Sequence, residues 1–163
     1  MAQYKLTYFE FRGKGELIRY LFACMNIEYE DYKIDFSEWP QHRSSYLYGK
    51  LPILEINGTV YNQSLAIGRY LAKKAGMTGK TELDDLHIDA IIDTINDFVT
   101  YYPWFSDKTV TWADFFWDIC GDSIKFYVPE FAKGYPKLSA LQKRVKEVPE
   151  IAAWIERRTP AWR

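Results

Sequence analysis

A chain of 163 residues is long enough to bury a core without disulfide or metal cross-links. Its 48% hydrophobic and 18% aromatic content is typical of a soluble globular protein and excludes a disordered chain. The formal net charge of -1 gives no electrostatic reason to expect nucleic acid or an anionic membrane as a partner, because both call for basic patches.

The lengths of the apolar segments and the spacing of the cysteines exclude further classes of protein. No stretch approaches the roughly 20 apolar residues that a membrane-spanning helix needs, and the first six residues lack the apolar segment of a secretion signal. We therefore expect a cytoplasmic protein. Cys24 and Cys120 lie far apart and outside any Cys-x-x-Cys spacing, which argues against a disulfide framework, a zinc site and a thioredoxin-type oxidoreductase.

Short strands alternate with helices in the first half of the chain. Tyr4 to Phe9 is aromatic and favours a strand, and Glu16 to Met25 carries apolar residues at helical spacing. Glu28 to Ile34 favours a second strand. These three segments predict a βαβ unit.

A hairpin and a helix come next. Asn57-Gly58 is a strong signal for a two-residue turn between the strands Ile53–Ile56 and Thr59–Asn62. Ser64 is a good N-cap for the helical run that follows, and Gly76 suits the position just after its last turn. The order βαβ then ββα is that of a thioredoxin-like α/β domain.

The second half of the chain has a purely helical pattern. Apolar residues from Ile88 to Tyr102 recur at helical spacing and predict one long amphipathic helix that Pro103 ends. A buried helix is expected from Trp112, and Pro136 and Pro149 each suit the first position of a further helix. The fold class is therefore an α/β domain followed by an all-α domain.

In a thioredoxin-like domain, three residues of this sequence would lie around one groove. Tyr8 ends the first strand, Pro52 precedes the hairpin and Ser64 begins a helix. Each alone has an ordinary structural explanation as a core aromatic, a turn or a cap. Together they would offer a phenol for a thiolate, a backbone edge for an extended peptide and a helix N-terminus for a carboxylate. A cis proline would hold the turn open.

At this point the sequence resembles the sigma-class glutathione transferases and, among them, the glutathione-dependent prostaglandin D synthases of the haematopoietic type. The likeness covers nearly the whole chain. Its motifs are Tyr8-Phe9, Arg12-Gly13, Glu16, Trp39-Pro40, Gly49-Lys50-Leu51-Pro52, Gln63-Ser64-Leu65-Ala66-Ile67, Arg69-Tyr70-Leu71, Asp89-Ala90-Ile91, Pro103-Trp104, Thr111-Trp112-Ala113-Asp114-Phe115 and Arg157-Arg158.

The resemblance implies a role for each matching residue. Catalysis would fall to Tyr8 and Lys14, with Tyr8 activating the glutathione thiol. Glutathione would be held by Tyr8, Trp39, Arg43, Lys50, Leu51, Gln63, Ser64 and Asp97. The electrophile pocket would include Phe9, Trp104 and Cys120. Asp93 and Asp97 would be metal ligands for magnesium or calcium at the axis of a homodimer, in which Asp97 reaches the other subunit's glutathione.

The chain departs from the family pattern in three places. Lys14 stands where the synthases have an arginine, and Asn96 replaces a carboxylate of the acidic helix face, which weakens the case for the metal. Only a few residues separate Trp104 from the helix at Trp112, where the family has a further helix. We therefore expect a thioredoxin-like domain over residues 1–78 and a shortened all-helical domain over residues 81–163.

Two functions follow from the resemblance. The first is a glutathione transferase that conjugates glutathione to a hydrophobic electrophile or isomerises prostaglandin H2 to D2. The second is a catalytically weak or inactive glutathione-binding relative, crystallin-like or exon-skipped, which the missing helix would favour. Retention of Tyr8, Ser64 and Asp97 favours the enzyme.

Overall fold

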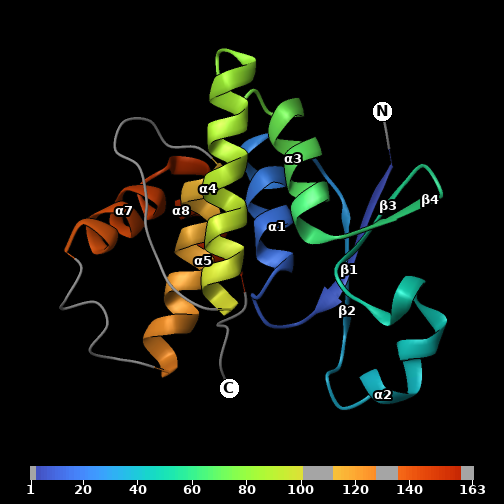
Figure 1. Ribbon diagram of the computed structural model, residues 1–163. Helices are drawn as coiled ribbons and strands as arrows, with labels where there is room; N and C mark the ends of the chain where they lie inside the picture. Colours follow the sequence, from blue (N-terminus) through green and yellow to red (C-terminus); the bar gives the residue numbers. More distant parts are fainter. Residues whose placement is uncertain (1–2, 101–111, 128–135, 159–163) are drawn as a thin grey trace.

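A four-stranded sheet and a group of helices make up the fold (Figure 1). The structure, a computed structural model, describes residues 3–100, 112–127 and 136–158, except for the side chains of 98–100 and 123–127. The strands are β1 (Tyr4–Phe9), β2 (Glu30–Ile34), β3 (Ile53–Ile56) and β4 (Thr59–Asn62). The helices are α1 (Gly15–Cys24), α2 (Trp39–His42), α3 (Ser64–Lys74), α4 (Glu82–Thr100), α5 (Trp112–Tyr127), α7 (Pro136–Lys146) and α8 (Pro149–Arg157).

The sheet is mixed, with strand order β2-β1-β3-β4. β1 runs parallel to β2 and antiparallel to β3, and β3 pairs with β4 across the Asn57-Gly58 turn, whose two residues have φ values of 50° and 82°. Positive φ at both positions is what a two-residue hairpin turn requires. The predicted order of elements along the chain, βαβ then ββα, and the predicted hairpin are confirmed.

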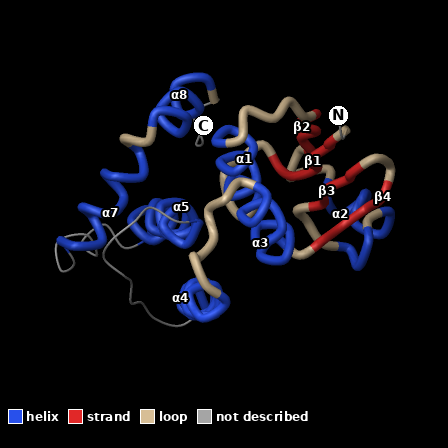
Figure 2. Tube along the Cα trace, turned by 90° about the horizontal axis from the view of Figure 1, so that it is seen from above, coloured by secondary structure: helices blue, strands red, loops and turns tan. Residues whose placement is uncertain are grey.

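Helices α1 and α3 cover one face of the sheet, and α2 lies on the other (Figure 2). Because side chains alternate along a strand, Leu6 of β1 enters the main core beneath α1, whereas Phe9 points to the α2 side and contacts Trp39. The main core continues from α1 and α3 into α4, α5, α7 and α8, so the sheet and the later helices share buried apolar side chains.

Helix α3 ends as the sequence predicts but begins one residue earlier than predicted. Gly76 has φ of 67°, and the N–H of Met77 donates to Ala72 at 2.9 Å, which is a left-handed C-terminal cap. The predicted N-cap role of Ser64 is wrong. Ser64 is already the first helical residue, and Gln63 takes the cap position with φ of 72° and no side-chain cap bond.

The long helix α4 carries the predicted apolar stripe. Ile92 and Ile95 are fully buried against α5, while Ile88 and Ile91 are half-buried against the same core. The predicted end at Pro103 lies outside the described residues. Helices α5, α7 and α8 begin at Trp112, Pro136 and Pro149, as predicted.

Among the described helices, none is long and apolar enough to cross a membrane.

Candidate active site

Tyr8 lies at the end of β1 with its ring buried and its hydroxyl against the turn that leads into α1. The backbone N–H of Lys14 donates a hydrogen bond to the Tyr8 oxygen at 3.1 Å. A Cβ at Gly13 would lie 2.4 Å from that oxygen, and one at Gly15 would lie 2.4 Å from the ring. Glycine at both positions therefore lets the turn close over the phenol.

Burial raises the pKa of the Tyr8 phenol, and the Lys14 N–H together with the nearby Arg19 guanidinium only partly offsets this effect. The phenol therefore stays protonated near neutral pH. With its oxygen already accepting one N–H, its O–H is free to donate to a second group.

The segment before β3 brings a backbone edge beside Tyr8. The Leu51-Pro52 peptide bond is cis, as predicted. Thr7 pairs with Ile53, so Tyr8 and Pro52 fall at the next register position of the two antiparallel strands. Leu51 packs in the same apolar cluster as Tyr8.

The N-terminus of α3 follows the hairpin. Ser64 is buried, with 6% of its surface exposed, and begins an eleven-residue helix. The first bond of this helix runs from the N–H of Ile67 to the carbonyl of Gln63 at 3.0 Å, so the N–H groups of residues 64–66 precede it. This end of α3 can therefore receive an anion.

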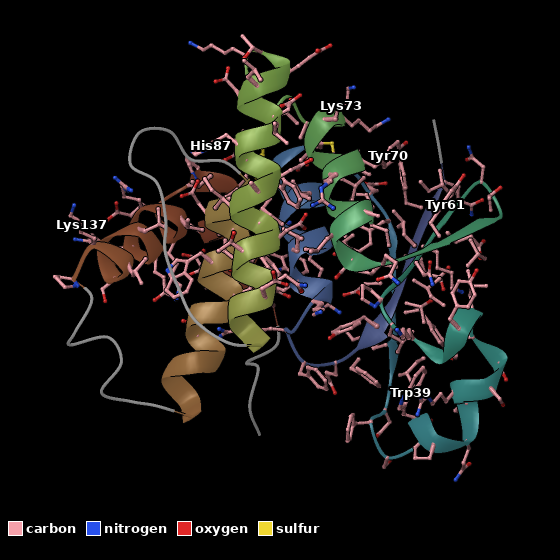
Figure 3. All side chains as sticks on the ribbon, in the orientation of Figure 1. Trp39, Tyr61, Tyr70, Lys73, His87 and Lys137 are labelled. Atoms are coloured by element: carbon pink, nitrogen blue, oxygen red, sulfur yellow. The ribbon has the colours of Figure 1, made fainter. Side chains whose placement is uncertain are left out.

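The α2 region supplies aromatic and basic side chains, among them Trp39, which is labelled in Figure 3. Trp39 is half-buried, with its ring centre 5.4 Å from that of Phe9 and 5.7 Å from that of Tyr46. The Nε of Arg43 donates to the carbonyl of Gly49 at 3.2 Å, and Lys50 is exposed. Arg43 therefore braces the turn before Lys50 in this structure.

The turn at Lys14 also reaches α4. The Nζ of Lys14 donates to the Oδ1 of Asn96 at 3.3 Å, and Asp97 is exposed on the same helix. Lys14 thus spans the space between the Tyr8 turn and the long helix through its flexible side chain.

The acidic face of α4 does not fit the predicted metal. The Nη2 of Arg69 donates to Asp93 at 2.6 Å, and its Nε lies 2.9 Å from Asp89, so a guanidinium already neutralises this face. Within the described part of the chain, no group of three His, Cys, Asp or Glu side chains could hold an ion. Magnesium or calcium at Asp93 and Asp97 therefore finds no support in the geometry.

Two of the predicted pocket residues, Phe9 and Cys120, lie in different buried clusters. Phe9 is buried in an aromatic cluster with Phe11, Phe36 and Trp39. Cys120 is a free thiol in the main core, where burial raises its pKa to about 12. Trp104 lies outside the described residues.

Sequence reasoning missed the charged residues that support the Tyr8 turn. Arg19 is 3% exposed and donates to the carbonyls of Phe9 and Phe11 at 3.2 and 3.4 Å, and Glu16 and Asp31 neutralise it. The sequence did offer one sign of this role, because Arg19 is a basic residue among the apolar residues of the buried helix α1. Arg12 pairs with Asp122 of α5, and no sequence pattern links residues so far apart.

Comparison with known proteins gives two family matches. The sequence model described as glutathione S-transferase, N-terminal domain, matches residues 4–73. The model described as glutathione S-transferase, C-terminal domain, matches residues 66–158. The two matches together cover most of the chain.

Individual relatives match along their whole length. The chain is 38% identical to human hematopoietic prostaglandin D synthase over 194 aligned positions, which cover 97% of this chain and 98% of that protein. The chicken protein of the same name is 40% identical with the same coverage. The solved structure of rat hPGDS in complex with a quinoline superposes with a TM-score of 0.87 at 36% identity, covering 97% of this chain and 98% of that one.

Proposed function

Because this chain belongs to the glutathione S-transferase family, we propose that it binds glutathione beside Tyr8 and activates the thiol for attack on a hydrophobic electrophile. The observation that carries the proposal is the buried Tyr8 hydroxyl, which accepts the Lys14 N–H and keeps its own proton to donate. A hydrogen bond to the ionised sulfur favours the thiolate over the thiol, whose unperturbed pKa is about 8.5. The thiolate is the nucleophile.

The groove beside Tyr8 suits an extended tripeptide. The backbone at Leu51, next to the cis Pro52, can pair with the glutathione backbone as an added strand. Ser64 and the N–H groups of the first turn of α3 can bind a glutathione carboxylate. The remaining proposed contacts are those of Trp39, Arg43, Lys50, Gln63 and Asp97, with Lys14 as a mobile cation near the thiol.

The relatives suggest the electrophile. Proteins named prostaglandin D synthase match over almost their full length, so isomerisation of prostaglandin H2 to D2 is one proposed reaction and conjugation of other electrophiles is the second. Phe9, Trp104 and Cys120 are the proposed pocket residues, and Cys120 contributes as an apolar wall because its thiol is buried. The full-length match to enzymes disfavours the inactive structural relative.

We propose sigma-class membership and a shortened helical part on related grounds. The alignment with the human relative spans 194 positions, whereas this chain has 163 residues, which supports an internal deletion. The sheet and helices α1 to α3 all lie before Thr78, which supports the division into residues 1–78 and 81–163. With a helix missing after Trp104, the electrophile pocket would be open on that side.

Glutathione binding is tested by calorimetric titration of the protein and the Ser64→Ala variant. A hydrogen bond to a charged group contributes about 1.5 to 3 kcal/mol, so the variant should bind about 10- to 100-fold more weakly. Thr59→Ala, an exposed residue of β4, is the matched control and should leave the affinity unchanged. No heat of binding for the unmodified protein would reject the proposed function.

A cytoplasmic homodimer is the proposed assembly. Tyr48 is 76% exposed at the tip of its turn, and an open groove of about 390 Å³ between β4 and α3 has Tyr61 and Tyr70 on its wall (Figure 3). Exposed aromatic surface of this kind marks an interaction site. Sedimentation at assay concentration should give twice the chain mass, and Tyr48→Ser should shift the protein toward monomer. An active monomer would contradict the dimer.

A further inference from the structure

Asp122 binds side chains from two other parts of the chain, and one of them is Arg12 in the turn that contacts the Tyr8 hydroxyl. It lies on α5 with 23% of its side chain exposed, and it accepts a hydrogen bond from the guanidinium of Arg12. From α7, Lys146 donates to both of its oxygens at 3.1 and 3.2 Å, and Gln142 donates at 3.3 Å. Asp122 therefore joins α5, α7 and the loop after β1.

Arg12 is fixed at both of its ends. Its carbonyl accepts the N–H of Glu16 at 3.1 Å, which starts α1, and its guanidinium donates to Asp122. The Nε of Arg12 is buried and has no hydrogen-bond partner among the described residues. In the described part of the chain, Asp122 supplies the only side-chain hydrogen bond to this guanidinium.

The turn held in this way is the one that contacts the phenol. Gly13 and Lys14 directly follow Arg12, and the Lys14 N–H donates to the Tyr8 oxygen at 3.1 Å. Donation into the phenol oxygen strengthens the O–H as a donor, because charge that develops on the oxygen is then stabilised. The distance from the Lys14 N–H to the Tyr8 oxygen thus depends on the position of Arg12.

We propose that Asp122 is a positioning residue that acts through Arg12 to hold the Gly13-Lys14 turn on the Tyr8 hydroxyl, so that the helical part of the chain tunes the ionisation of the glutathione thiol. The inference deepens the proposed function and rests on it. Neither Asp122 nor Arg12 needs to touch glutathione. Loss of the carboxylate frees the turn, lengthens the Lys14-to-Tyr8 bond and leaves a weaker donor for the thiolate.

The test is the pH profile of kcat/KM with an aryl halide, together with the ultraviolet absorbance of bound glutathione thiolate, for Asp122→Asn. The thiol should titrate at higher pH, with a rate loss of roughly threefold to tenfold on the acid side that disappears at alkaline pH. Glutathione affinity should stay within about twofold, since the groove contacts are intact. Asp122→Glu, which keeps the charge, should restore much of the rate.

Lys146→Met is the matched control. It removes the other charge that Asp122 binds but leaves the Arg12 pair in place, so it should lower the melting temperature without moving the pH profile. Equal pH shifts in Lys146→Met and Asp122→Asn would overturn the inference, as would an unchanged profile in Asp122→Asn. If Asp122→Asn does not fold, Arg12→Gln breaks the same pair from the loop side and must give the same shift.

A Tyr8→Phe variant in the same assay separates the two claims. If Tyr8→Phe leaves the thiol titration unchanged, the proposed role of Tyr8 fails. If Tyr8→Phe raises the pKa of the bound thiol and neither Asp122→Asn nor Arg12→Gln raises it, only the positioning role of Asp122 fails.

Discussion

Tyr8→Phe should lower turnover with an aryl halide about 10- to 100-fold at neutral pH, because a hydrogen bond to a charged group contributes about 1.5 to 3 kcal/mol and each 1.4 kcal/mol is tenfold. The variant keeps the ring and its packing against Phe11, so the fold is unaffected. KM for glutathione should change little, since the tripeptide is held mainly elsewhere in the groove. Steady-state kinetics with both substrates varied would measure the two effects separately.

The same variant makes a signed prediction about pH. Removing the donor raises the pKa of the bound thiol. The rate deficit is therefore largest below the thiol pKa of the wild type, and it shrinks as the pH rises through the thiol pKa of the variant. At high pH the more basic thiolate should react as fast as the wild type or faster, because nucleophilicity rises with pKa. Tyr32→Phe on the exposed side of β2 is the control. A deficit that is constant with pH would contradict thiol activation.

Local signals predicted most of the secondary structure. Asn57-Gly58 specified the hairpin because both residues tolerate positive φ, and Gly76 specified the end of α3 for the same reason. Pro149 marked the start of α8 because its missing N–H costs nothing in a first turn. Ser64 misled the prediction of the α3 start, because a capping residue also fits inside the first turn.

The candidate site was predictable only where it coincides with strand and helix ends. Tyr8, Pro52 and Ser64 fall at or beside such ends, so a thioredoxin-like order predicts that they share one groove. The pairing of Arg12 with Asp122 joins residues from the first loop and α5, and it depends on how α5 packs against α1. Arg69 likewise neutralises the α4 face at which the resemblance implied a metal. Tertiary packing of this kind leaves no local pattern.

Glu16→Gln should destabilise the fold more than any surface change. Glu16 is 2% exposed and accepts from Arg19 at 3.2 Å, from the Trp154 indole at 2.9 Å and from Arg158 at 2.6 Å. Asp31 still neutralises Arg19 in the variant, whereas Arg158, 9% exposed, is left without a carboxylate. Breaking a buried ion pair costs about 3 to 5 kcal/mol, a large share of a typical margin of about 5 to 15 kcal/mol.

Denaturant unfolding measures this loss, with Glu147→Gln as the control. Glu147 and Lys143 form an exposed pair at 3.8 Å, and such pairs contribute about 0 to 1 kcal/mol. Because Glu16 joins α1 to the tryptophan and arginine at the end of the chain's last described helix, amide exchange in α8 should accelerate first. Equal losses in the two variants, or unchanged exchange in α8, would show that the Glu16 cluster does not hold α8 against α1.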